Sequence, residues 1–285
     1  MTVEHGFLVI DKPSGLTSHD VVARLRRRFS TKQVGHAGTL DPMATGVLVI
    51  GVNNATKFLQ YIVTGKKRYT AKIRLGISTV SDDQDGEVIS TAEWNEITNQ
   101  NIESELQNFV GTINQVPSSV SAKKIDGERA YNLVREGKPV ELTPKEVTID
   151  QIKILSINRN QQLDVEIDVI CSAGTYIRAI ARDLGVALHV GGHLIELRRT
   201  EVLPFSIEDS GDIESASLLP LSSEIAKFMK TRSLSFEEIT EIRFGRRIAE
   251  SKTVGPVAGV SPSGDVVAIL ENREGKAQPI TVFNS

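Results

Sequence analysis

The sequence is poor in cysteine and in long apolar runs. Cys171 is the single cysteine, so no disulfide can form within the chain. No apolar run approaches the roughly 18 residues that a membrane-spanning helix needs. The first dozen residues lack the basic start and the longer apolar stretch of a secretory signal. We therefore expect a cytoplasmic protein that has no association with a membrane.

The length and the charge distribution describe a globular protein with one strongly basic part. The chain has 285 residues, 40% of them hydrophobic, which suffices for a full core and a second small domain. Residues 1–80 hold twelve basic and four acidic side chains, a net charge of +8, and the remainder carries −11. The basic part is either a surface for phosphates or a set of solvated helix and strand faces.

Periodicity predicts a mixed α and β chain. Residues 67–75 alternate strictly, with Tyr69 on the apolar face and three cations on the other face. A helix capped by Thr17 or Ser18 carries an apolar stripe and the arginines of residues 24–28. Further strands are expected at residues 6–10, 47–52, 149–157 and 163–171, further helices at 96–110 and 174–185, and an acidic turn at 80–86.

Two segments suggest how the chain is organised. Residues 115–145 form a long polar stretch, with a short helix expected at 129–135, and a loop of this length is usually functional. From residue 234 onward we expect one short helix and then β-like segments at 257–260, 266–271 and 279–283. A catalytic domain at residues 1–232 and a small β-rich domain at 233–285 are therefore predicted.

The most informative segment is the tight loop of residues 35–46, which reads GHAGTLDPMATG. Its glycines, proline and small residues exclude a regular helix or strand. Asp41 is the only acidic residue between Asp20 and Val80, so this loop presents a single carboxylate. An aspartate before a proline is most often a turn residue, and a catalytic aspartate is the alternative.

Five segments in register resemble the TruB family of tRNA pseudouridine-55 synthases. They are the GHAGTLDP loop with the strand after it, GFLVIDKPSG at residues 6–15, KRY at 67–69, GTYIR at 174–178 and LRRT at 197–200. The resemblance covers residues 5 to about 205. It implies a pseudouridine-synthase fold of the α+β class, in which helices flank a mixed, largely antiparallel sheet. It also implies a small C-terminal PUA-like domain, with weaker similarity.

The resemblance implies an isomerase that converts uridine 55 in the T-arm of tRNA to pseudouridine without a cofactor. Asp41 would supply the carboxylate that acts near C1′ or C6 of a flipped-out uridine. Whether it attacks the sugar, attacks the base or stabilises an elimination stays open. Arg178 would hold Asp41 ionised through a bidentate pair, and Tyr69 would stack on the uracil with its hydroxyl available for proton transfer.

Further roles follow from the same resemblance. Leu197 would pack the other side of the pocket, and His36 would fill the space that flipped nucleotides vacate. Lys12, in the Lys-Pro turn, and Lys123, in the mobile RNA-binding loop of residues 115–145, are also expected to bind substrate. The expected partner is the T-arm stem-loop of tRNA, with no metal and with the chain acting as a monomer.

Other functions are weighed against this one. Aspartate-based phosphoryl transfer would require a phosphate-binding loop or a second acid near Asp41, and neither is present in the sequence. His189 and His193 have a ligand-like separation, but two glycines lie between them and a structural role is far more common. A non-catalytic RNA-binding or RNA-folding protein on the same scaffold is the third alternative. Binding alone would not need Asp41, Tyr69 and Arg178 together.

Overall fold

The computed structural model describes residues 4–118, 124–125, 128–129 and 143–283. The helices are α1 (Ser18–Arg28), α2 (Leu59–Val63), α3 (Asn99–Gln107), α5 (Ile177–Ala187), α6 (Leu221–Glu224) and α7 (Phe236–Arg243), with 3-10 turns η1 (Asn53–Phe58), η2 (Ile207–Asp209) and η3 (Ile225–Lys227). The strands up to residue 171 are β1 (Gly6–Lys12), β2 (Val34–His36), β3 (Thr45–Val52), β4 (Lys67–Leu75), β5 (Ile77–Thr79), β6 (Val88–Thr91), β7 (Gly111–Gln115), β8 (Lys124–Ile125), β9 (Glu128–Arg129), β10 (Lys145–Asn158) and β11 (Leu163–Cys171). The later strands are β12 (Gly192–Val202), β13 (Phe205–Ser206), β14 (Leu219–Pro220), β15 (Lys230–Ser233), β16 (Ile248–Ala249), β17 (Val257–Val260), β18 (Val266–Arg273) and β19 (Lys276–Val282).

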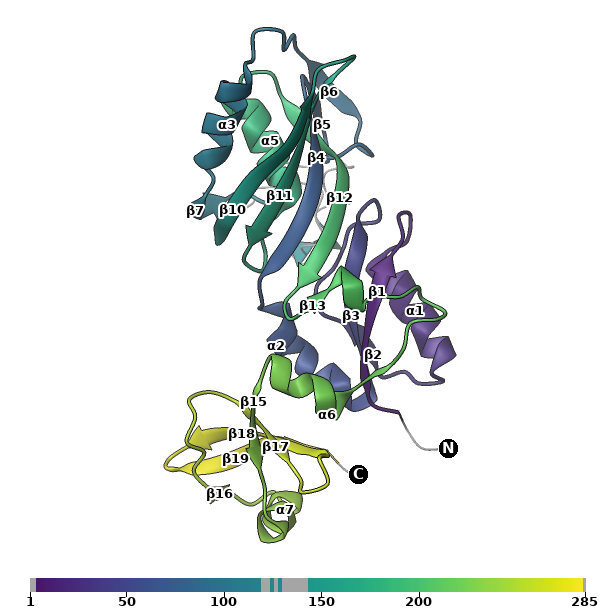
Figure 1. Ribbon diagram of the computed structural model, residues 1–285, viewed down its shortest axis with the longest axis vertical. Coiled ribbons are helices and arrows are strands. Elements are labelled where there is room, and N and C mark those ends of the chain that lie inside the picture. Colours follow the sequence, from purple (N-terminus) through teal and green to yellow (C-terminus); the bar gives the residue numbers. More distant parts are fainter. Residues whose placement is uncertain (1–3, 119–123, 126–127, 130–142, 284–285) are drawn as a thin grey trace.

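A ten-stranded sheet forms the body of the molecule (Figure 1). Its order is β14-β1-β3-β12-β4-β11-β10-β7, with β2 paired to β3 and β13 to β12. The pair β3–β12 is parallel, and the other pairs of this sheet are antiparallel in the described chain. The prediction of a mixed, largely antiparallel sheet flanked by helices is confirmed.

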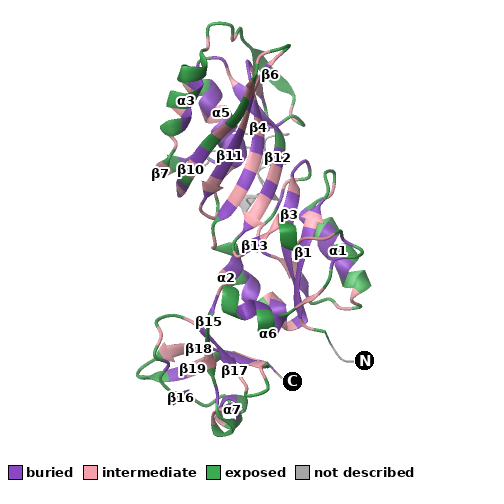
Figure 2. Ribbon diagram, viewed as in Figure 1, coloured by how far each residue is buried: buried purple, intermediate pink, exposed green. Residues whose placement is uncertain are grey.

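Local sequence explains the elements that border the site. Thr17 caps α1 by accepting a hydrogen bond from the Asp20 backbone N–H, and the Asp20 carboxylate accepts one from the Thr17 backbone N–H. In β4 the predicted alternation is observed, since Tyr69 and Ile73 are buried while Thr70 and Lys72 are only partly covered. The apolar face of β4 packs against α5 in one core cluster, whereas the residues of the opposite face are partly exposed (Figure 2).

A second, five-stranded sheet with the order β15-β17-β18-β19-β16 forms the C-terminal part, beyond α6 (Figure 1). It shares a hydrophobic cluster with the first sheet, in which the Phe58 and Phe283 rings stack with centroids 5.4 Å apart. The β-rich C-terminal part is confirmed. The predicted division after residue 232 cuts through β15, which belongs to the second sheet, and a division into two domains stays a prediction.

Most predicted elements are present, with shifted ends. The helix expected at 96–110 is α3, and the strand expected at 149–157 is part of the longer β10. The helix expected at 129–135 lies largely outside the described residues, and Arg129 itself belongs to β9. Strand β12, at the centre of the sheet, was not predicted. Within the described ranges no helix combines the length and the apolar character that crossing a membrane requires.

Candidate active site

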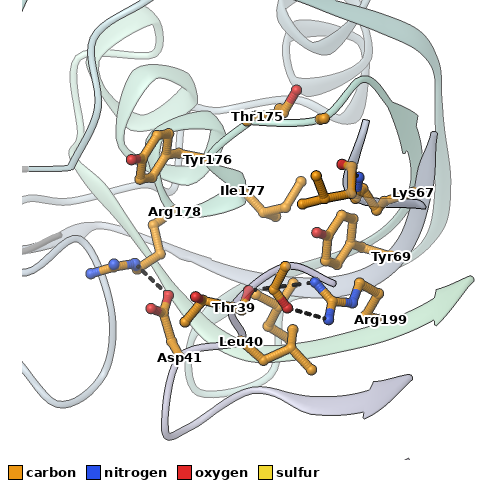
Figure 3. A pocket seen from close by; sticks show the side chains of 15 residues that line it. Thr39, Leu40, Asp41, Lys67, Tyr69, Thr175, Tyr176, Ile177, Arg178 and Arg199 are labelled. Carbon is orange, nitrogen blue, oxygen red and sulfur yellow. Dashed lines mark hydrogen bonds and ion pairs between the residues drawn. The ribbon is translucent and has the colours of Figure 1, made fainter. Parts of the chain in front are cut away.

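A cavity of about 420 Å³ opens where the residue 35–46 loop meets β4, β12 and the start of α5. Asp41, Tyr69, Arg178 and Leu197 all line it, together with Lys67 and Arg199. Figure 3 shows Asp41 and Arg178 on one side of the pocket and Lys67, Tyr69 and Arg199 on the other. The structure therefore brings together four side chains that are separated by up to 156 positions in the printed sequence.

The loop that carries Asp41 is fastened to the β1–α1 turn. The Leu40 backbone N–H donates to Ser18 Oγ at 2.8 Å, and the Gly15 N–H donates to the Pro42 carbonyl at 2.8 Å. At the end of the loop Gly46 has a φ of 98°, and a Cβ there would lie 2.1 Å from the Arg199 carbonyl oxygen. Only glycine fits this close approach of β3 and β12. These contacts fix the position of the Asp41 backbone.

Asp41 forms an ion pair with Arg178. The distance from Arg178 Nε to Asp41 Oδ2 is 3.1 Å, and 37% of the Asp41 side chain is exposed against 6% for Arg178. The expected bidentate pair is wrong, because the same guanidinium also binds the turn between β5 and β6. Its Nη1 donates to Asp83 Oδ2 at 3.1 Å and to the Ser81 carbonyl at 2.9 Å. The Arg178 guanidinium is therefore shared between the Asp41 carboxylate and this turn.

Tyr69 is buried in the cavity wall beside Arg199. Burial raises the pKa of the Tyr69 hydroxyl, and the Arg199 guanidinium partly offsets this rise. The hydroxyl is therefore protonated at neutral pH and is able to donate a proton, while the ring offers an apolar face. Leu197 on β12 supplies further apolar wall and is also buried.

Comparison with known proteins decides the family. A model of the TruB family pseudouridylate synthase N-terminal domain matches residues 26–177. Models of the tRNA pseudouridylate synthase B C-terminal domain and of the tRNA pseudouridine synthase II C-terminal region match residues 178–223 and 229–284. The chain belongs to the TruB family. The expectation of a pseudouridine synthase, an isomerase, is confirmed.

Relatives and solved structures agree with the family models. The chain is 48% identical to tRNA pseudouridine synthase B of Arthrobacter sp. (strain FB24), over 98% of this chain and 96% of the relative. It is 45% identical to the protein of that name from Thermobifida fusca (strain YX), over 98% of each. The archaeal box H/ACA sRNP Nop10-Cbf5 complex contains a chain with the same fold, at 22% identity and a TM-score of 0.71, with 99% of this chain and 87% of that chain covered.

Lys12 lies outside the cavity of this TruB family member. Its side chain is fully buried, and its ammonium donates to the carbonyls of Pro13, Leu16 and Pro42 at 2.9, 2.7 and 3.2 Å. An ammonium has three N–H groups, so none remains for a ligand. The expected role of Lys12 in substrate binding stays a prediction. Lys12 instead ties the turn of β1 to the loop that carries Asp41.

Of the other predicted substrate contacts, His36 lies within the described residues and Lys123 does not. His36 is half-buried, and its ring meets that of His19 edge-on with centroids 5.6 Å apart. Burial, followed by the charges of His19 and Arg199, lowers the pKa of His36. His36 Nδ1 has no hydrogen-bond partner among the described residues, and His36 is not part of the cavity lining. Lys123 lies outside the described residues, so its role stays a prediction.

The root of the predicted mobile loop is attached to α5. The Gln115 side chain donates to the Tyr176 carbonyl at 3.0 Å and accepts from the Tyr176 N–H at 2.8 Å. Arg182 donates to the Val116 carbonyl at 2.8 Å and pairs with Asp82 at 3.2 Å. These contacts fix residues 115–116, at the start of the predicted loop, against α5, the helix that carries Arg178.

The predicted cationic surface is smaller than the sequence indicated. Cations of β4 are paired with acids on neighbouring strands, as in the contacts of Arg68 with Asp168 and of Arg74 with Asp164, both at 2.8 Å. These side chains lie on the face opposite Tyr69 and are paired with acids, and phosphate binding by this strand stays a prediction. On α1, Arg26 and Arg28 donate to backbone carbonyls. Arg24 and Arg27 are exposed and meet no acceptor among the described residues.

His189 and His193 were weighed in the sequence as possible metal ligands. No group of three or more His, Cys, Asp or Glu side chains there is able to hold a metal ion. His193 is buried, and its Nδ1 lies 3.0 Å from the Ile77 carbonyl oxygen, which gives this histidine a structural partner. His189 adopts a positive φ of 59° at the turn after α5. The structural role expected for these histidines agrees with this geometry.

Proposed function

We propose that this chain isomerises uridine 55 in the T-arm of tRNA to pseudouridine, with Asp41 as the essential carboxylate and without a cofactor. Relatives that are 45–48% identical over nearly the whole chain carry the name tRNA pseudouridine synthase B, which supports tRNA as the substrate. The proposal includes the expected cytoplasmic location of the protein, and we expect the chain to act as a monomer.

The ion pair between Asp41 and Arg178 carries the proposal. The reaction breaks the bond between C1′ and N1, turns the uracil and joins C5 to C1′, so it needs neither a redox step nor water. A buried arginine next to the carboxylate orients it, as attack on C1′, attack on C6 or stabilisation of an elimination each require. Because the Asp41 side chain is 37% exposed at the cavity, a nucleotide is able to reach it.

The cavity of about 420 Å³ is in the size range of small-ligand sites, and we assign it to a single extruded nucleotide. A uridine stacked within an RNA loop cannot reach a carboxylate at the wall of this cavity, so the base must flip out first. Tyr69 and Leu197 then supply apolar contacts for the uracil, and the protonated Tyr69 hydroxyl is suited to donate a proton. We assign His36, at the start of the residue 35–46 loop, to the space that the flipped nucleotide leaves in the RNA.

RNA contacts outside the pocket are assigned to the exposed arginines of α1 and to Lys123 of the residue 115–145 loop. Arg24 and Arg27 lack carboxylate partners within hydrogen-bond range in the described chain, which leaves their guanidinium groups available for phosphates. The C-terminal sheet, with its PUA-like character, is proposed to add further RNA contacts.

Tritium release tests the function. In tRNA labelled with [5-³H]uridine, formation of the bond from C5 to C1′ liberates the C5 hydrogen to water. The wild-type chain should release the label from wild-type tRNA, but not from tRNA with cytidine at position 55, and Asp41→Ala should release none. Release from the cytidine variant would contradict the assigned position, and no release by the wild-type chain would contradict the function.

A further inference from the structure

Lys67 is a buried cation in the wall of the catalytic cavity to which neither the family resemblance nor the sequence assigned a role. It is the first residue of β4, two positions before Tyr69, and only 5% of it is exposed. It lines the same cavity as Asp41 and Arg178. In Figure 3 it lies on the Tyr69 side of the pocket.

The hydrogen bonds of Lys67 leave one donor unused. Its ammonium donates to the carbonyls of Val63 and Gly65, at the end of α2. No third acceptor for Lys67 occurs in the described part of the chain. Lys12, which is also buried, uses all three N–H groups on carbonyls and lies outside the cavity. A buried donor without a partner is costly unless a ligand supplies the acceptor, and the cavity is where that ligand would lie.

The charge of Lys67 is also unbalanced locally. Arg178 is flanked by the carboxylates of Asp41 and Asp83, whereas Lys67 has no carboxylate within ion-pair distance among the described residues. Arg199 nearby is 1% exposed, donates to the carbonyls of Val47, Gly38 and Thr39, and has no carboxylate within ion-pair distance among the described residues. The wall that holds Lys67 and Arg199 therefore carries positive potential that the protein itself does not neutralise.

Breaking the bond between C1′ and N1 places negative charge on the uracil, and a positive potential stabilises this charge. The electron pair of that bond moves onto the uracil, where the negative charge spreads to O2 and O4, and the pair later forms the bond from C5 to C1′. A pre-aligned cation in a water-poor cavity stabilises charge that develops in the transition state. We propose that the free N–H of Lys67 binds a carbonyl oxygen of the flipped uracil and stabilises this negative charge. The role rests on the proposed pseudouridine synthase activity.

A rate measurement with a matched control tests the role. Lys67→Met keeps much of the side-chain shape and removes the charge, and we expect it to lower the single-turnover rate by about 100-fold while the Kd for tRNA changes little. Lys72→Met is the control, because Lys72 lies on the same strand, faces the opposite side and is partly exposed beside Glu196. Its rate should match that of the wild type.

The pH profile separates a charge effect from a structural one. Burial, aided by Arg199 of β12 and opposed by Cys171 of β11, lowers the pKa of Lys67 to about 8. The ammonium is charged below this pH and neutral above it, so the wild-type rate should fall as pH rises through about 8. Lys67→Arg should recover part of the rate and keep it at higher pH, because a guanidinium stays protonated. Lys67→Met should lack this alkaline fall.

The outcomes distinguish this role from the proposed function. A wild-type chain that forms no pseudouridine would overturn both. If the wild type is active and Lys67→Met is equally fast, or loses tRNA affinity with an unchanged rate, only the Lys67 role is overturned. An alkaline fall that persists in Lys67→Arg and Lys67→Met belongs to another group, such as Lys12, whose pKa burial also lowers to about 8, and it overturns the role as well.

Discussion

Asp83 Oδ2 lies 3.1 Å from Arg178 Nη1, so the arginine that faces Asp41 is held from behind by a second carboxylate. Asp83 is itself buried and accepts a hydrogen bond from Ser81 Oγ. The turn between β5 and β6 therefore sets the orientation of the Arg178 guanidinium. Asp41 meets a cation whose rotation is restricted by contacts made outside the cavity.

Asp83→Asn should slow pseudouridine formation by about 10-fold or more, because the amide holds Arg178 less firmly and misdirects its N–H groups. Binding of tRNA should be unchanged, since Asp83 is buried behind Arg178. Single-turnover kinetics and filter binding measure the two effects. Asp85→Asn, two residues along the same turn, is the control and should behave as wild type. Equal rates for the two variants would show that Asp83 does not orient Arg178.

Tyr69→Phe separates the ring from the hydroxyl. The variant keeps the stacking surface, and we expect a rate loss of about 100-fold with little change in tRNA affinity, because general acid–base catalysis is typically worth at least that factor. Turnover near the wild-type rate would assign Tyr69 to stacking alone. Thermal unfolding of both proteins checks that the fold is unaffected.

The exposed arginines of α1 predict a salt effect on binding. Arg24→Gln and Arg27→Gln should each weaken tRNA binding and reduce the slope of log K against log salt by about one unit per lost phosphate contact. Arg74→Gln is the control, since Arg74 is paired with Asp164 on the other face of the sheet. An unchanged slope in the α1 variants would show that this helix is merely solvated.

Cys171 should resist alkylation in the folded protein. It is fully buried beside Lys67 on the paired strand, and burial raises the pKa of its thiol to about 11. The reactive thiolate is therefore scarce at pH 8, and iodoacetamide should modify Cys171 only as fast as the chain unfolds. Rapid labelling without denaturant, followed by mass spectrometry, would contradict the buried position.

The alternation of apolar and polar residues predicted those strands whose side chains follow it. Strand β4 was predicted to the residue because its apolar and polar side chains alternate from Arg68 to Leu75, with Lys67 the one cation on the buried face. Strand β12 was missed because buried His193 and Arg199 stand where the alternation requires apolar residues. Both polar side chains are satisfied by carbonyls of other elements, which only the tertiary structure supplies.

Some site residues could be found from sequence motifs, whereas others depend on contacts that only the tertiary structure shows. Asp41, Tyr69, Arg178 and Leu197 were located through motifs, and the structure gathers them around one cavity. Asp83 was read as part of an acidic turn, since nothing local connects it to Arg178, 95 positions away. The ion pairs of the β4 cations could not be predicted, because the acids that pair with them belong to other strands. The sequence of one strand cannot show the charges of its neighbours.

The central claim is that the Asp41 carboxylate carries the chemistry, and Asp41→Asn tests it most directly. The amide preserves the shape of the side chain but lacks the charge and the nucleophilicity. Single-turnover assays with labelled tRNA, together with binding measurements, should show no detectable pseudouridine with Asp41→Asn while tRNA affinity remains near that of the wild type. Pseudouridine formation at close to the wild-type rate by Asp41→Asn would contradict the account.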